Sequence, residues 1–222
     1  ATGYSLFIVG STSLVGSVSY FRKGLVNVRT AIIFGIPAII AVFLTRAFLV
    51  PAIPETVLQL GDIVLSKNLF IMALFAVMML AASFSMIKKS SQPVETEDTV
   101  QKFNYPLILA EGLVVGTLTG LVGAGGGFLI IPALVVLSKL PIKEAIGTSL
   151  VIIAAKSLIG FLGEEFGAVD WTFLLSVSAF ALVGIFIGTA LSKKIDGAKL
   201  KPAFGWFVLV MGIYILVKEF FL

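Results

Sequence analysis

The sequence is built from long blocks of mostly apolar residues, and this feature constrains the fold more than any other. Each block approaches the length of about 20 residues that an α-helix needs to cross a bilayer. Hydrophobic residues make up 59% of the 222-residue chain and charged residues 13%, which is too apolar a balance for a soluble domain of this size. The blocks also lack the apolar and polar alternation of membrane β-barrels. We therefore expect an all-α polytopic membrane protein embedded in a lipid bilayer.

The apolar blocks fall into two halves, 1–87 and 105–222, separated by a polar linker at 88–104. One block is too short to cross a bilayer comfortably and follows a run of glycines, which predicts a broken helix or a re-entrant hairpin. The expected membrane segments are 4–21, 28–50, 68–87, 105–123, 127–139, 144–163, 170–192 and 201–221.

Basic residues are distributed unequally between the two sides of this topology. Twelve of the 16 lysines and arginines fall on the side of the linker, three fall on the other side, and Lys156 lies within a span. Cytoplasmic loops carry an excess of Lys and Arg. The asymmetry predicts a multi-pass membrane protein with the linker in the cytoplasm and the C-terminus outside.

The residue types that are missing exclude several classes of function. The chain has no histidine and no cysteine, which rules out Cys/His metal sites, thiol catalysis and Ser-His-Asp triads. No paired carboxylates occur within the spans, and the net charge of +4 is sorted by membrane side. We therefore expect no catalytic residues, no metal site, no cofactor and no nucleic-acid partner.

The sequence contains an internal repeat. Residues 1–16 align with 145–160 at eight identical positions, and Asn27 and Asp170 follow as N-cap residues of the next helix. The topology places the two copies in opposite directions across the membrane, as in secondary transporters. The second copy is preceded by a glycine-rich hairpin, so we expect that the first repeat, 1–87, lacks its N-terminal equivalent and that the natural protein begins before Ala1. Duplication in a protein that moves nothing is the alternative.

Two groups of glycines precede the second copy. The first three lie four residues apart on one helix face, which favours close helix packing. The later triplet breaks the helix and exposes backbone amides, which suit an anion if they line a cavity. A tight turn at the membrane surface is the alternative interpretation. The packing glycines are Gly112, Gly116 and Gly120, and the expected anion-binding amides are those of Gly125, Gly126, Gly127 and Phe128.

Polar side chains within the spans complete the candidate site. Thr148, Ser149 and Ser5 could donate hydroxyl groups to an anion, although such residues often hold helices together instead. A lysine inside a span is costly and indicates function, so Lys156 could neutralise the anion. Snorkelling, or pairing with Glu111, would also explain this lysine. Glu111 could serve the dipole of its helix or carry a proton.

The pattern GxxxGxxxGxxGxGGGxxxxP runs from Gly112 to Pro132, and AxGTSL follows at 145–150. Together they resemble the sulfite exporter TauE/SafE family, and the resemblance extends from residue 1 to about residue 195. It implies an inner-membrane permease for sulfur-containing anions such as sulfite and organosulfonates. We therefore predict secondary transport by alternating access, and leave open a coupling proton or ion and a homo-oligomer. An anion channel and a non-transporting structural protein are the alternatives.

Overall fold

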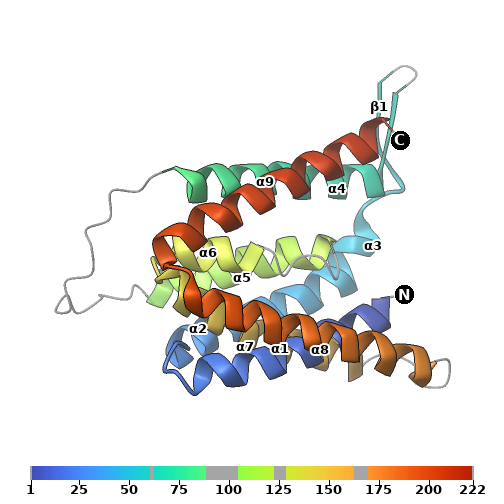
Figure 1. Ribbon diagram of the computed structural model, residues 1–222. Helices are drawn as coiled ribbons and strands as arrows, with labels where there is room; N and C mark the ends of the chain where they lie inside the picture. Colours follow the sequence, from blue (N-terminus) through green and yellow to red (C-terminus); the bar gives the residue numbers. More distant parts are fainter. Residues whose placement is uncertain (1, 61–62, 89–104, 123–128, 163–169, 222) are drawn as a thin grey trace.

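A computed structural model describes residues 2–60, 63–88, 105–122, 129–162 and 170–221 of the chain. Its helices run alongside one another in a bundle, with the N- and C-termini at the same end (Figure 1). Helices α4 and α9 form one side of the bundle, α5 and α6 lie in the middle, and α1, α2, α7 and α8 form the other side (Figure 1). We call the opposite end, where α4 ends and α5 begins, the linker end.

The helices match the expected membrane segments closely. Six of them are long and apolar enough to cross a membrane, and Pro106–Val122 is a shorter apolar helix. The all-helical membrane fold is therefore confirmed. The helices are α1 (Thr2–Phe21), α2 (Val28–Leu44), α3 (Val50–Ala52), α4 (Lys67–Ile87), α5 (Tyr105–Val122), α6 (Ile130–Val136), α7 (Ile142–Leu162), α8 (Trp171–Lys194) and α9 (Gly197–Phe221).

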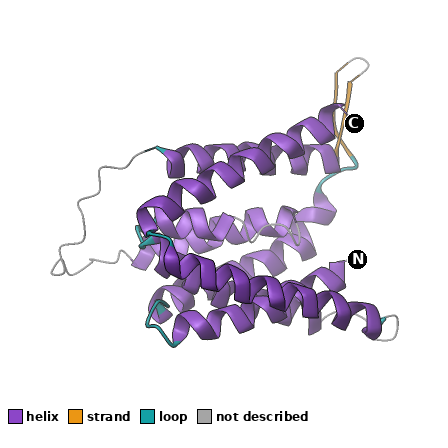
Figure 2. Cartoon of the chain, in the orientation of Figure 1, coloured by secondary structure: helices purple, strands orange, loops and turns teal. Residues whose placement is uncertain are grey.

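A small antiparallel hairpin lies between α3 and α4 and was not expected from the sequence (Figure 2). It pairs β1 (Thr56–Leu60) with β2 (Ile63–Ser66). The strands contain several Val, Ile and Thr residues, which favour extended backbone. With at most five residues in each strand, the apolar run is too short to register as a further span.

Glycines set the distance between α2 and α5, which run parallel. A Cβ atom added at Gly116 would lie 2.5 Å from the carbonyl oxygen of Ala38, and one at Gly120 would lie 2.7 Å from Cβ of Thr45. A Cβ at Gly112 would collide with the carbonyl oxygen of Phe34. The predicted close packing of these three glycines is confirmed.

Helices α1 and α7 pack antiparallel, through two contacts that mirror each other. A Cβ at Gly16 would lie 3.3 Å from Leu150 Cδ1, and a Cβ at Gly160 would lie 3.4 Å from Leu6 Cδ1. The sequence alignment equates Gly16 with Gly160 and Leu6 with Leu150. The contact between Gly16 and Leu150 is therefore equivalent, in the aligned helices, to the contact between Gly160 and Leu6.

The core of the bundle surrounds the short helix α6. Ile130 and Leu134 are 2% and 0% exposed, and they belong to a cluster that also includes Phe34, Met79 and Ile152. Large apolar side chains also cover the outside, such as Phe180, which is 80% exposed. Exposed apolar side chains over so many helices are those expected where lipid is the solvent.

Candidate functional site

The glycine-rich segment connects α5 to α6. Gly125, Gly126, Gly127 and Phe128 lie outside the described residues, so their role as anion ligands stays a prediction. The described chain resumes at Leu129, which is 7% exposed, and continues into the buried helix α6. Helix α6 has seven residues, which is too short for its dipole alone to hold an anion. An anion site in this region therefore depends on basic side chains.

Two basic side chains lie within the membrane-spanning part of the bundle. Lys156 lies on α7 and is half-buried, and Arg46 lies within the span Val28–Ala52 and is also half-buried. Each is a basic residue inside a span, where a charge is costly to bury. In the described ranges, the structure records no ion pair between either cation and a carboxylate. Both residues therefore place positive charge inside the bundle of apolar helices, and we call these two residues the cationic centre.

Arg46 lies in a π-helix that interrupts the regular α-helical backbone. This element, η1 (Thr45–Leu49), continues α2 and leads into α3. Its first residue, Thr45, is buried against Gly120 near the end of α5. Short π-helical turns occur frequently at functional sites because they reposition side chains. The π-helix therefore begins beside the last turn of α5.

By sequence, Arg46 is one of the three basic residues on the side away from the linker, and it was not among the predicted site residues. The signal that could have found it was its position four residues before the end of an apolar segment, where an arginine is costly.

The predicted hydroxyl ligands have structural partners. Thr148 is fully buried, and its Oγ1 accepts a hydrogen bond of 2.9 Å from the backbone N–H of Asn27. Ser149 Oγ donates a hydrogen bond of 2.9 Å to the carbonyl oxygen of Ile146. Ser5 is half-buried on α1. Thr148 precedes Lys156 by eight residues, or about 12 Å along the helix, so the hydroxyl groups and the cationic centre occupy different levels of the bundle.

Glu111 does not pair with Lys156. It lies near the start of α5, is 5% exposed, and accepts a hydrogen bond of 2.5 Å at Oε2 from Ser138 Oγ. Ser138 follows α6, so this bond joins the end of α6 to α5 at the linker end. The interpretation of Lys156 as the partner of Glu111 is therefore wrong.

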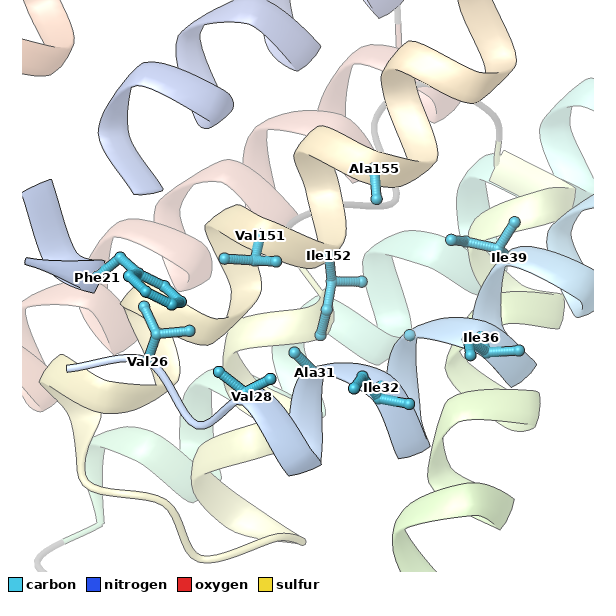
Figure 3. A pocket seen from close by; sticks show the side chains of 11 residues that line it. Phe21, Val26, Val28, Ala31, Ile32, Ile36, Ile39, Val151, Ile152 and Ala155 are labelled. Atoms are coloured by element: carbon cyan, nitrogen blue, oxygen red, sulfur yellow. The ribbon is translucent and has the colours of Figure 1, made fainter. Parts of the chain in front are cut away.

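A cavity between α2 and α7 is lined by hydrocarbon alone, as Figure 3 shows. An anion entering it would lose its hydration without gaining hydrogen bonds. This cavity is therefore separate from the cationic centre and unsuited to an anion. Residues lining it include Phe21, Ala31, Ile36, Val151, Ile152 and Ala155.

Comparison with known proteins matches this architecture to one family. The sequence profile of the sulfite exporter TauE/SafE matches residues 1–215. The chain belongs to this family. The match runs from α1 into the last turns of α9 and so includes the helices that carry Arg46, Lys156 and Glu111.

Relatives within the TauE/SafE family are named as membrane transporters. A probable membrane transporter protein of Xylella fastidiosa (strain 9a5c) is 27% identical over 99% of this chain and 80% of its own length. The probable membrane transporter protein YunE of Bacillus subtilis (strain 168) is 26% identical over 88% of this chain and 72% of its own length. No solved structure matches the chain. The protein is thus a multi-pass membrane transporter and not an enzyme.

Proposed function

We propose that this TauE/SafE protein is a secondary transporter of a small sulfur-containing anion, such as sulfite or an organosulfonate, that works by alternating access. The family description names sulfite export, and the single observation that carries the proposal is that two half-buried basic residues, Arg46 and Lys156, lie within the spans. The chain contains no GxxxxGK[ST] motif, so we expect energy from an ion or anion gradient rather than from ATP.

Charge repulsion gives the cationic centre its affinity for an anion. Like charges repel strongly where water and counterions are scarce, and basic residues within spans are costly. An oxyanion between Arg46 and Lys156 would remove this repulsion and accept charge-assisted hydrogen bonds from both. The guanidinium group of Arg46 suits the paired oxygens of sulfite or a sulfonate. The amides of Gly125–Phe128 and the hydroxyl groups of Thr148, Ser149 and Ser5 remain proposed additional ligands.

Alternating access requires two halves that can move against each other around the site. The proposed halves are the inverted repeats 1–87 and 105–222. Two mirrored features support their relation by a twofold axis. One is the pair of glycine–leucine contacts between α1 and α7. The other is a pair of hydrogen bonds: Asn27 N–H donates to Thr148 Oγ1, and Asp170 N–H donates to the hydroxyl of Tyr4 at the aligned position.

Neutral substitutions test the cationic centre. The purified protein is placed in liposomes, and uptake of radiolabelled sulfite is measured with unlabelled sulfite inside. Each lost charge-assisted hydrogen bond is worth about 1.5–3 kcal/mol, so Lys156→Gln and Arg46→Gln should each raise the half-saturating sulfite concentration about tenfold or more. Lys218→Gln removes an exposed charge at the end of α9 and serves as the matched control.

Three outcomes separate the proposal from its alternatives. Saturable uptake that is stimulated by internal sulfite supports a transporter. Unsaturable flux without such stimulation indicates an anion channel, and no flux of sulfite or sulfoacetate indicates a structural role. If Lys156→Gln and Arg46→Gln both behave like Lys218→Gln, the site assignment is wrong even though transport stands.

A further inference from the structure

Glu111 is a buried carboxyl group in which only one of the two oxygens has a hydrogen-bond partner. It is 5% exposed, its Oε2 accepts the hydrogen bond from Ser138, and its Oε1 is a buried oxygen without a hydrogen-bond partner. Buried polar atoms almost always have partners, and an ionised carboxylate with a bare oxygen is far costlier to bury than a neutral carboxylic acid. The arrangement therefore favours a proton on Oε1.

A metal cation fits this position less well than a proton does. Hard cations such as Ca²⁺ and Mg²⁺ need six or more oxygen ligands, and the polar side-chain atoms joined here are those of Glu111 and Ser138. Within the described residues, no cluster of three or more acidic side chains could hold a metal ion. Apolar side chains of the core, including Ile108 and Val115, flank Glu111 on α5 and are buried.

The hydrogen bond from Ser138 fastens the end of α6 to α5. Beyond α6 the chain makes a wide turn, in which Leu140 N–H donates to the carbonyl oxygen of Leu134 at 2.9 Å. Lys139 has φ 55 in this turn, a left-handed conformation that is strained for a non-glycine residue. Helix α6 itself is buried. Loss of the Ser138 hydrogen bond would therefore release the end of α6 from α5.

We propose that Glu111 is the proton-binding site of this transporter and that its protonation closes the linker end of the bundle. The inference rests on the proposed transport function. The proton comes from water at the linker end, which Glu111 approaches within about 9 Å along α5. Protonated Glu111 permits the buried contact with Ser138. Loss of the proton leaves a charge that must be hydrated, so the turn after α6 separates from α5 and water enters.

Charged groups on the neighbouring elements set the surroundings of this site. Helices α2, α4 and α6 and the π-helix η1 pack against α5, and η1, which carries Arg46, meets α5 at Gly120, near the opposite end of α5 from Glu111. Their basic residues at the linker end are Arg29 on α2, Lys88 after α4 and Lys139 after α6, and all three side chains are exposed. They therefore face solvent, whereas the carboxyl group of Glu111 faces the core and Ser138. The state that binds the proton more tightly gains population as the pH falls, so acid favours the closed linker end.

Transport measurements test the coupling. In liposomes, wild-type protein should take up labelled sulfite several-fold faster, in one direction, when a pH gradient is imposed. Glu111→Gln mimics the protonated form permanently. It should keep sulfite counterflow within about threefold of wild type while losing all stimulation by the pH gradient. Wild-type counterflow without any response to the gradient overturns the proton site but leaves transport intact. A Glu111→Gln variant that still responds to the gradient also overturns it.

Labelling with a thiol reagent tests the conformational part independently of transport. The chain has no native cysteine, so Leu134→Cys places one thiol on the buried face of α6. In the otherwise wild-type chain, the rate at which this cysteine reacts with maleimide should rise as the pH increases. The same cysteine in the Glu111→Gln chain is measured at each pH as the control, and its rate should rise less. If the two curves coincide, the proposal fails even where no flux is measurable.

Two further variants test the proposal without relying on the folding of Glu111→Gln. Glu111→Asp retains a carboxyl group and should retain the pH response. Ser138→Ala removes the hydroxyl group that holds the turn closed, so the rise in labelling should move to lower pH. A Glu111→Asp protein without a pH response, or a Ser138→Ala curve that does not move, counts against the proposal.

Discussion

Single hydrogen bonds to helix N-termini hold the two predicted repeats together. Asn27 and Asp170 cap α2 and α8 through their side chains, which accept from Thr30 and Phe173 at 3.0 Å. Each cap residue also uses its own backbone N–H to reach a hydroxyl group on another helix, Thr148 or Tyr4. A cap therefore fixes the start of its helix and at the same time ties it to the helix pair α1 and α7.

The two tying bonds differ in exposure, so their removal should differ in cost. The Asn27–Thr148 bond is partly buried, and the Asp170–Tyr4 bond is exposed. Thr148→Val should lower the free energy of unfolding by about 1–3 kcal/mol, because it leaves a shielded N–H without a partner. Tyr4→Phe should cost less than about 1 kcal/mol, because water can replace the phenol. Unfolding in detergent measures both, and an equal or larger loss for Tyr4→Phe would contradict this account.

Helix α8 differs from α2 although the predicted repeat equates them. Helix α2 is covered by the glycine face of α5, whereas Gly184 and Gly188 of α8 have no atom of the described residues within 4 Å of an added Cβ. Glycines at four-residue spacing favour close helix packing, and in α5 they pack closely. In α8 the same spacing leaves an open face. Spacing alone therefore identifies a face that can pack closely, but it does not supply a partner.

A pair of alanine substitutions in the 222-residue chain tests this contrast. Gly116→Ala pushes a methyl group against the backbone of Ala38, so it should destabilise the protein by about 1–3 kcal/mol. Gly184→Ala adds its methyl group to open space and should be neutral or slightly stabilising, since alanine favours helix. Resistance to unfolding by a denaturing detergent compares them. Equal damage from both would mean that the face of α8 is packed in the membrane.

At the scale of the whole molecule, charge asymmetry and helix order predict the orientation. The linker end receives most of the basic residues, and both chain termini lie at the other end (Figure 1). The positive-inside rule then places the linker end in the cytoplasm. In this orientation, the proton that reaches Glu111 through the open linker end comes from the cytoplasm.

Single cysteines in the cysteine-free chain test the orientation. Ala198→Cys lies in the first turn of α9 at the linker end, and Glu55→Cys lies at the opposite end; both positions are exposed. In right-side-out vesicles, a membrane-impermeant maleimide should label only Glu55→Cys, and in inverted vesicles only Ala198→Cys. Leu174→Cys, at a fully buried position, should resist both. The reverse pattern would invert the orientation and place the proton supply outside.

The sequence by itself determined which segments cross the membrane, because hydropathy is local and each span must be apolar over its whole length. The ends of α4, α5 and α7 fall within two residues of the predicted ends. The glycine face of α5 and the caps Asn27 and Asp170 were also predictable, since each depends on spacing or residue type within one element.

Only the tertiary structure decided which residues meet. Glu111 accepts a hydrogen bond from Ser138 rather than pairing with Lys156, and Asn27 donates its backbone N–H to Thr148. These relations join segments that are far apart in the chain and depend on how apolar helices pack. Between helices surrounded by lipid, packing depends on fine shape and on single hydrogen bonds, because hydrophobicity no longer distinguishes one apolar face from another. The local pattern of residues therefore predicts the spans but carries little information about their partners.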